Sequence, residues 1–90
     1  MKVLFYGNVQ EYTSGEKSFE PGFKAGIEQS VRTLIDLLGE RFGARCKEFL
    51  LGEHSCFFLV NGKGIMTTGG LGTPLHAGDT VEVLPSVGGG

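Results

Sequence analysis

Apolar residues recur with the spacing of an α-helix in the middle of the chain. After Ser30 they return every three or four residues and form one stripe: Val31, Leu34, Ile35, Leu38 and Phe42. The Ser30 hydroxyl can cap the free amides of a first turn, and Gly43 is a natural helix stop. The pattern predicts one amphipathic helix that begins at Ser30 and ends before Gly43, with Gly39 costing about 1 kcal/mol inside it relative to alanine.

Alternating apolar and polar positions before this helix predict two strands. In residues 2–10, one face carries Val3, Phe5 and Val9, and the other carries Leu4 and Tyr6. Turn residues follow, and residues 16–20 predict a short second strand. Pro21 stops that strand, because proline cannot donate to a ladder. These two strands are predicted to pair as a hairpin.

Three further strands are predicted after the helix, over residues 55–61, 63–68 and 80–84. Asn61-Gly62 is a strong turn signal between the first two of them. Residues 71–75 predict a loop with an apolar anchor at each end. The segment 44–54 fits no single pattern, although its three apolar residues at 49–51 indicate a short helical turn on the core.

Ninety residues are enough for one domain with a single modest core. The predicted order is strand, strand, helix, strand, short strand and strand. This order fits one helix packed on one face of a mixed sheet, an α+β architecture. We expect the folded body to span residues 1–84 and residues 85–90 to form a flexible glycine-rich tail.

Composition and charge argue against several classes of function. Eight Lys and Arg residues are spread along the chain against ten Asp and Glu residues, and the absence of a basic run argues against nucleic acid as a partner. The longest apolar runs, residues 3–6 and 56–60, are far too short to span a bilayer, so no membrane partner is expected. Two cysteines form neither a disulfide framework nor a CxxC pair, so the expected location is cytoplasmic, where thiols stay reduced.

The body of the chain offers few groups for catalysis or metal binding. His54 and His76 lie in predicted loops and are interpreted as bystanders. Cys56 is expected to face the core as a small hydrophobic side chain, whereas an exposed Cys46 is the minor alternative for a functional thiol. The glycine-rich segment 69–72 lacks the lysine that follows in a phosphate-binding loop. We therefore expect no metal site and no bound cofactor.

The glycines that close the sequence are the strongest candidate for chemistry. Gly88, Gly89 and Gly90 follow Pro85, which ends the last predicted strand. Residues 85–90 reach about 20 Å when fully extended. Glycine has no Cβ, so a terminal carboxylate on this stem can enter the narrow active site of a partner. The competing interpretations are a frayed end or a remnant of cloning.

A docking surface for such a partner is predicted on the sheet face away from the helix. Ordering the tail costs on the order of 1–2 kcal/mol per residue, which contacts of the folded body must offset. The sequence places four apolar side chains on this face: Leu4, Tyr6, Leu59 and Leu84. Clustered apolar side chains on a surface are typical of partner sites, although scattered surface leucines are also ordinary.

Several segments in order resemble one family over nearly the whole chain. The opening VLFYGNVQEYTSGEK, the segment FLVNGKGI and the ending GGLGTPLHAGDTVEVLPSVGGG are similar to those of the MoaD/ThiS ubiquitin-like sulfur carriers. The ordered combination VNG…TPLxxGDxVxxxPxVxGG is the specific part of the match. The resemblance implies a β-grasp fold, a mixed four- to five-stranded sheet packed on one main helix, with the first and last strands side by side.

The resemblance also implies a chemistry located at the last residue. In the family, an adenylyltransferase similar to ubiquitin-activating enzymes uses ATP to join AMP to the terminal glycine. Sulfur from a desulfurase relay then displaces AMP and leaves a thiocarboxylate. Gly90 would carry these groups, with Gly89 and Gly88 as spacers, and Pro85 and Val87 would join the docking surface. Three closing glycines, in place of the usual pair, depart from the family pattern.

Two features favour the MoaD branch, in which the tail enters the large subunit of molybdopterin synthase and gives up sulfur for the molybdenum or tungsten cofactor. Residues 44–54 make the chain longer than the thiamine carriers, and Pro85 before the tail resembles that branch. The alternatives are a carrier for thiamine, tRNA thiolation or cysteine synthesis, a ubiquitin-like modifier of lysines, and a β-grasp interaction module whose tail has no role.

Overall fold

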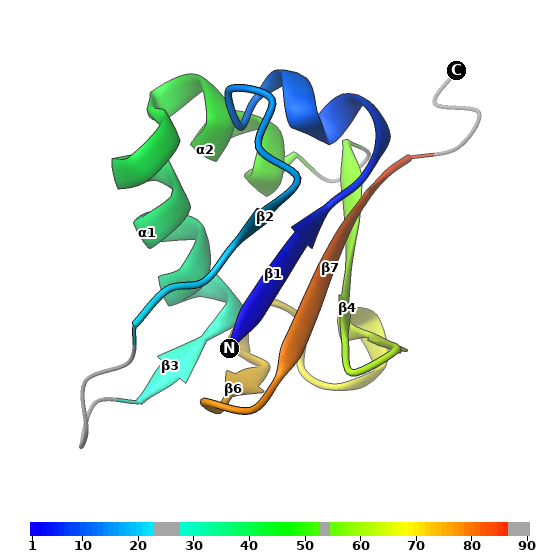
Figure 1. Cartoon of the computed structure of the whole chain (residues 1–90). Helices are drawn as coiled ribbons and strands as arrows, with labels where there is room; N and C mark the ends of the chain where they lie inside the picture. Colours follow the sequence, from blue (N-terminus) through cyan, green and yellow to red (C-terminus); the bar gives the residue numbers. More distant parts are fainter. Residues whose placement is uncertain (23–27, 53–54, 87–90) are drawn as a thin grey trace.

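A five-stranded mixed sheet supports two helices on one of its faces (Figure 1). This computed structural model describes residues 1–22, 28–52 and 55–86. The strand order is β2-β1-β7-β4-β5, and a separate two-stranded sheet pairs β3 with β6. The predicted α+β class is confirmed, as is a mixed sheet packed on one main helix, to which the structure adds a second, shorter helix.

The first and last strands of the described chain lie side by side near the middle of the sheet. The strands of this sheet are β1 (Lys2–Phe5), β2 (Ser18–Phe19), β4 (Cys56–Val60), β5 (Lys63–Gly64) and β7 (Thr80–Pro85). β1 and β7 run parallel, with Val3 opposite Val81 and Phe5 opposite Val83. The other three pairings of this sheet are antiparallel.

The main helix, α1 (Val31–Phe42), has the start and the end that the sequence predicts. Thr33 donates its backbone N–H to the Ser30 hydroxyl over 3.3 Å, and Ser30 donates its own N–H to the Thr33 hydroxyl over 2.8 Å. This reciprocal capping box satisfies two backbone groups that the first turn leaves unpaired. Gly43 ends the helix with a φ of 107°, a value in the region that favours glycine.

The ambiguous segment after α1 forms a second helix, α2 (Ala44–Leu51). Gly39 explains how α2 packs so close to α1, because a Cβ at that position would lie 3.0 Å from the Cβ of Lys47. Lys47 also reaches Asp36 across the two helices, with 2.9 Å between Nζ and Oδ1. Cys46 on α2 is only 1% exposed, so the option of an exposed thiol there is wrong.

The connection between β1 and β2 is the main departure from the predicted strands. Residues 2–10 do not form one strand, because the chain turns into a 3-10 helix, η1 (Gly7–Glu11), where Gly7 has a φ of 57°. Val9 is fully buried, but it lies in this helix and not in a strand. The antiparallel pairing of β1 with β2 is as predicted, but β2 covers only part of residues 16–20.

Two very short strands form the second sheet, which the sequence analysis did not predict. β3 (Gln29–Ser30) leads into α1 and pairs with β6 (Pro74–Leu75), in the segment assigned to a loop. Of the predicted strand 63–68, two residues form β5 and the rest continue into the 3-10 helix η2 (Ile65–Thr67). A third 3-10 helix, η3 (Gly70–Gly72), precedes β6.

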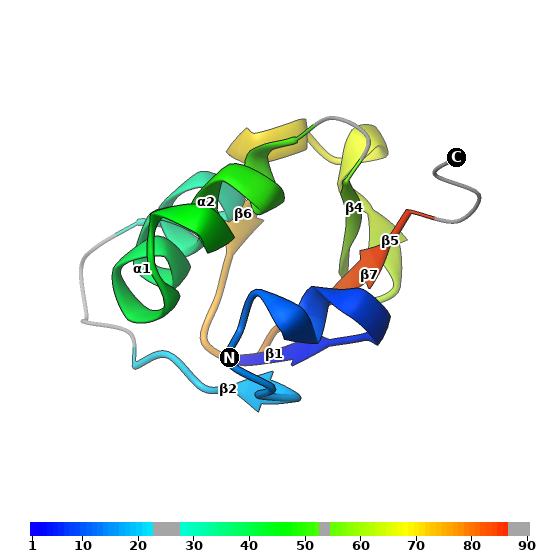
Figure 2. The ribbon, with the colours of Figure 1, turned by 90° about the horizontal axis from the view of Figure 1, so that it is seen from above.

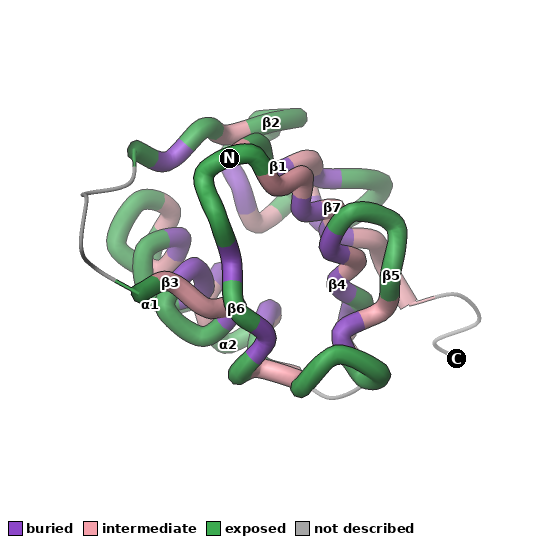
Figure 3. Tube along the Cα trace, turned by 90° about the horizontal axis from the view of Figure 1, so that it is seen from below, coloured by how far each residue is buried: buried purple, intermediate pink, exposed green. Residues whose placement is uncertain are grey.

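The core lies between the sheet and the helices. Figure 3 colours the buried positions along the chain, and they include positions on the strands and on α1. The sheet contributes Val3, Phe5, Cys56, Phe58, Val60, Val81 and Val83, and α1 contributes Val31, Leu34, Ile35 and Leu38. The predicted inward face of each long strand is therefore confirmed. Neither α1 nor α2 has the length and apolar composition that crossing a bilayer requires.

Candidate functional site

The predicted tail begins at the end of β7, the middle strand of the sheet. Pro85 belongs to this strand and pairs with Cys56 of β4, so the strand extends one residue beyond its predicted end. The Ser86 N–H then donates to the carbonyl oxygen of Ser55 over 3.2 Å. The remaining candidates, Val87 and the glycines 88–90, lie outside the described residues. Their roles and the division into 1–84 and 85–90 stay predictions.

The structure gathers the predicted docking residues on the sheet face opposite the helices. Leu4 of β1 and Leu59 of β4 both lie opposite Glu82 of β7. One row closer to the tail, Leu84 lies opposite Phe57. On the other side of this row, the Tyr6 N–H donates to the Val83 carbonyl over 3.0 Å. We call this surface the outer face: Leu4, Tyr6, Phe57, Leu59, Glu82 and Leu84. Its use in binding stays a prediction.

Phe57 is the outer-face residue that sequence reasoning missed. Its side chain is 53% exposed, more than that of Tyr6 at 39%. The signal was present, because Cys56, Phe58 and Val60 were assigned to the inner face and side chains alternate along a strand. An exposed phenylalanine beside the half-buried Leu84 gives the outer face its largest uncovered apolar group.

A hydrogen bond joins Tyr6, the residue after β1, to β7 across the outer face. The Tyr6 hydroxyl donates to Oε2 of Glu82 over 2.9 Å. This bond, with small contributions from desolvation and from the carboxylate charge, raises the pKa of Tyr6. The bond also restrains the ring of Tyr6 near β7. The outer face thus combines apolar side chains with one carboxylate.

Both thiols are withdrawn from solvent. Cys46 is 1% exposed and Cys56 is 8% exposed, and the Cys56 thiol points at the Leu50 carbonyl, 3.9 Å from Sγ. Burial, with a smaller effect from a charge on Cys46, raises the pKa of Cys56 to about 11. Burial also raises the pKa of Cys46. Because the thiolate is the reactive form, neither side chain is suited to accept or pass on sulfur.

The VNG and GD pieces of the sequence motif hold two loops together. The Asn61 amide donates from Nδ2 to Oδ1 of Asp79 over 2.9 Å and accepts at Oδ1 the Thr80 N–H over 2.9 Å. Asp79 also accepts the His76 N–H at Oδ2 over 2.8 Å. Desolvation acts to raise the pKa of Asp79, but the hydrogen bonds from Asn61 and His76 outweigh it and hold the pKa below its usual value.

Of the two histidines, only His76 belongs to the described residues, and it lies on the surface. The His76 side chain is 77% exposed, and its Nδ1 lies 3.6 Å from Asp79, in the loop before β7. His54 falls outside the described residues. Among the described residues, no three His, Cys, Asp or Glu side chains come together as a metal site.

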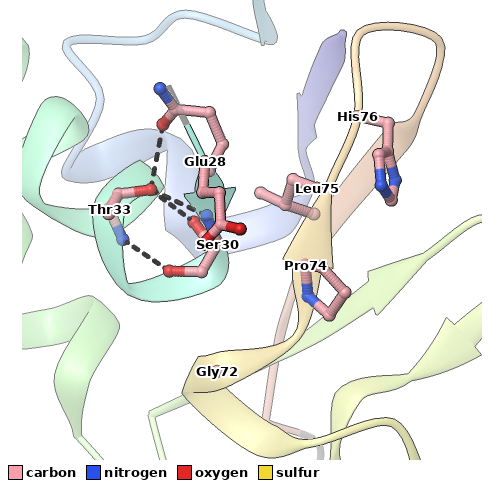
Figure 4. Close-up of a pocket in the computed structure, with 8 residues that line it drawn as sticks. Glu28, Ser30, Thr33, Gly72, Pro74, Leu75 and His76 are labelled. Atoms are coloured by element: carbon pink, nitrogen blue, oxygen red, sulfur yellow. Dashed lines mark hydrogen bonds between the residues drawn. The ribbon is translucent and has the colours of Figure 1, made fainter. Parts of the chain in front are cut away.

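A pocket of about 660 Å³ lies between the start of α1 and β6 (Figure 4). Pro74, Leu75 and His76 form one side, and Ser30 and Thr33 form part of the other. The polar groups of Ser30 and Thr33 are already engaged, since they form the capping box and the Thr33 hydroxyl donates to the Gln29 side chain over 2.9 Å. The pocket is separate from the outer face.

Comparison with known proteins extends the resemblance to a family assignment. The model of the ThiS family matches residues 3–90. A comparison with curated proteins finds no match. The fold is similar to a chain in the crystal structure of the Amycolatopsis orientalis BexX/CysO complex, with a TM-score of 0.78 and 30% identity over 99% of this chain and 98% of that one.

Two archaeal structures share the fold at lower identity. One is a Pyrococcus furiosus protein described as molybdopterin converting factor, subunit 1, with a TM-score of 0.70 and 24% identity over 96% of this chain and 95% of that one. The other is the small archaeal modifier protein 1 from Methanosarcina acetivorans, with a TM-score of 0.68 and 23% identity over 99% and 94%. The family match over nearly all residues decides the assignment: this chain belongs to the ThiS family of ubiquitin-like sulfur carriers.

Proposed function

We propose that this protein carries sulfur on the carboxyl group of Gly90 and delivers it for molybdopterin biosynthesis. The observation that supports the proposal most is the family match, which extends from residue 3 through the closing glycines at residue 90. Gly90 carries the reacting carbonyl, and Gly89 and Gly88 are spacers that let it pass through a narrow channel. The protein is not an enzyme in this account; it is the substrate of one.

The proposed chemistry proceeds in two balanced steps. The Gly90 carboxylate attacks the α-phosphate of ATP, forms an acyl–AMP anhydride and releases pyrophosphate. A sulfur nucleophile then attacks the acyl carbon, AMP leaves, and the product is a thiocarboxylate. When the sulfur comes from a persulfide, the mixed acyl disulfide must be cleaved by a second thiol, which supplies the electrons. AMP is needed because a free carboxylate is a poor electrophile.

The partner enzymes supply the reactive groups in this scheme. ATP is bound by a partner adenylyltransferase similar to ubiquitin-activating enzymes, and this chain binds no cofactor itself. Both described thiols are buried with raised pKa values, so a partner desulfurase relay provides the sulfur. The body docks through the outer face, joined by Pro85 and Val87. Binding through the exposed Phe57 and its neighbours offsets the entropy lost when the tail is ordered.

The acceptor that we propose is the large subunit of molybdopterin synthase. The segment that makes the chain longer than the thiamine carriers forms α2, and Pro85 precedes the tail as the MoaD resemblance implies. The likeness to the Pyrococcus protein described as molybdopterin converting factor, subunit 1, agrees with this choice but extends to the fold alone.

Intact-mass measurement tests the carrier function. The protein is incubated with ATP, sulfide and candidate adenylyltransferases, and the expected mass increase is the difference between one sulfur atom and one oxygen atom. Omission of ATP should abolish the increase. No change with any of several cognate candidates would contradict the proposal. Transfer of the sulfur to a molybdopterin precursor in the presence of the synthase large subunit then tests the acceptor.

A second candidate function follows from the names of the similar structures. The similarity to the CysO complex chain, at 30% identity, favours a carrier that supplies a different acceptor, and cysteine synthesis is one of the alternatives. The likeness to the small archaeal modifier protein, at 23% identity, extends to the fold alone, and attachment to other proteins is a further alternative. Both uses need the same adenylylated Gly90. Isopeptide-linked conjugates in a pull-down would identify a modifier, whereas loss of sulfur only to a cysteine-forming acceptor would identify the other carrier.

A further inference from the structure

The point where the chain leaves the sheet is held from two sides. On the β4 side, the Ser86 N–H donates to the Ser55 carbonyl over 3.2 Å, after Pro85 has paired with Cys56. On the β1 side, the ring of Pro85 lies against Gly7, the first residue of η1. The start of η1 and the end of β7 lie side by side in Figure 1 and again in Figure 2, seen from above.

Glycine is favoured at position 7 for two separate reasons. Its φ of +57° lies in the left-handed region, which side chains disfavour. A Cβ there would also lie 2.8 Å from Cγ of Pro85, closer than real Cβ contacts come, and 3.4 Å from Cδ. Ring pucker is the only internal freedom of the Pro85 Cγ, because the ring is closed onto the backbone of β7. A side chain at Gly7 must therefore displace the strand end.

We propose that Gly7 is a positioning residue for the tail. Without a side chain, it lets the Pro85 ring seat on the turn between β1 and η1 and fixes the place and direction in which the chain leaves the sheet. This inference rests on the proposed function, since the tail has to be aimed only if its last carboxylate reacts in a partner. Outer-face contacts determine how tightly the body binds the partner. The contact between Pro85 and Gly7 determines where the Gly90 carboxylate lies in the partner's active site.

This division of roles predicts a particular kinetic defect. A Cβ at Gly7 displaces Ser86 and Pro85, which lies at the margin of the proposed docking surface, but it does not touch Leu4, Phe57 or Leu59 at its centre. Docking affinity should therefore be retained, while the reacting carboxylate is misplaced. Misplacement by about 1 Å can lower a rate by roughly a hundredfold. The defect should appear in kcat and leave KM for the carrier nearly constant.

Gly15 offers a matched control. It lies in the same connection between β1 and β2, its φ is +79°, and a Cβ there would meet nothing within 4 Å. Gly15→Ala therefore introduces the same type of backbone strain as Gly7→Ala without touching the tail base. If strain alone mattered, both variants would lose stability and activity alike.

The experiment compares these variants in ATP–pyrophosphate exchange with an adenylyltransferase that acts on the wild-type chain. We expect Gly7→Ala to lower kcat roughly tenfold to a hundredfold with KM changed little, and Gly15→Ala to behave like the wild type at a temperature where both are folded. In a Pro85→Ala background, which removes Cγ and Cδ, Gly7→Ala should have a much smaller effect. Equal losses at both glycines, a defect confined to KM, or an undiminished loss in that background would overturn the inference.

A partner-free measurement separates this inference from the proposed function. Amide hydrogen exchange at Ser86 should be faster in Gly7→Ala than in Gly15→Ala, because displacement of Pro85 weakens the bond to Ser55. Unchanged Ser86 exchange overturns the inference even if the carrier chemistry is real. A wild-type chain that no adenylyltransferase modifies contradicts the proposed function instead. Should Gly7→Ala not fold, Pro85→Ala alone must show the faster Ser86 exchange, and normal exchange there overturns the inference.

Discussion

The two ends of β7 are held in different ways. At its start, Asp79 collects hydrogen bonds from Asn61 and His76, and Asn61 in turn binds the Thr80 N–H. At its end, Pro85 packs on a glycine and Ser86 forms one backbone hydrogen bond. The start is fastened by polar side chains that stay within the fold. The end is held by packing of the Pro85 ring and by one backbone hydrogen bond, and the closing glycines follow it in the sequence.

This difference divides the sequence motif into two parts. The pieces VNG and GD belong to the motif that resembles the family. In the structure, their side chains Asn61 and Asp79 form hydrogen bonds that hold two loops together. The closing glycines lie outside the described residues and hold the proposed chemistry. Changes at the start of β7 should therefore lower stability and spare sulfur transfer, whereas changes beyond its end should do the opposite.

The largest expected effect comes from blocking the tail. One alanine added after Gly90 should abolish thiocarboxylate formation, because the Cα next to the new carboxyl group carries a Cβ and the carboxyl group lies one residue out of register. The melting temperature should stay that of the wild type. Intact mass and a thermal melt measure the two quantities. A blocked chain that still gains sulfur at the wild-type rate would show that the reactive group lies elsewhere.

The opposite effect is expected at the start of β7. Asp79→Ala leaves the Asn61 amide and the His76 N–H without their acceptor, and should lower the free energy of unfolding by about 1–3 kcal/mol. Denaturant unfolding measures the loss, and sulfur loading of the folded fraction should be unchanged. The control is Asp36→Ala, which removes an exposed ion pair with Lys47 and should cost about 0–1 kcal/mol. Equal losses of unfolding free energy in the two variants would show that the hydrogen bonds of Asp79 do not stabilise the start of β7.

Changes on the outer face should weaken binding to the partner and leave stability nearly unchanged. Phe57→Ala should weaken binding to the adenylyltransferase about tenfold, because an exposed aromatic side chain at the centre of a docking surface typically contributes one or more kcal/mol. Stability should change little, since Phe57 is more than half exposed. Leu37→Ala on α1, also exposed, is the control and should bind normally. Calorimetric titration compares them, and normal binding by Phe57→Ala would place the docking surface elsewhere.

The smallest expected effect is a pH dependence at the start of β7. The pKa of Asp79 is lower in the folded chain than in the unfolded chain, so its ionised form contributes stability that is fully present above about pH 4. That contribution is lost as the pH falls through the lowered folded value. The difference in unfolding free energy between the wild type and Asp79→Asn should therefore shrink in acid. A difference that stays constant between neutral pH and about pH 2 would contradict this assignment.

The spacing of apolar residues was sufficient to predict the elements that are long enough for this spacing to repeat. The stripe from Val31 to Phe42 and the alternation around Val81 and Phe58 each extend over several residues, so the helix and the inner sheet face could be predicted. The pairing of β3 with β6 could not, because strands of two residues have no period. The sequence predicts Val9 in a strand because its apolar side chain fits both an alternating strand and a 3-10 helix that buries it, and the structure has the 3-10 helix.

The candidate site was predictable in outline but not in its details. Alternation placed Leu4, Tyr6, Leu59 and Leu84 correctly and, applied to β4, would also have given Phe57. The i, i+4 spacing of Cys46 and Leu50 was available as a sign that Cys46 is buried in a helix. The contact between Gly7 and Pro85 joins residues far apart in the sequence, and no local pattern encodes such a contact.

The most direct test of the central claim is to locate the sulfur within the modified chain. After loading with ATP, sulfide and an adenylyltransferase, the protein is fragmented in a mass spectrometer. The account predicts one sulfur in place of one oxygen, found only in fragments that contain Gly90. An added sulfur in fragments that contain Cys46 or Cys56, with the closing glycines unmodified, would contradict it.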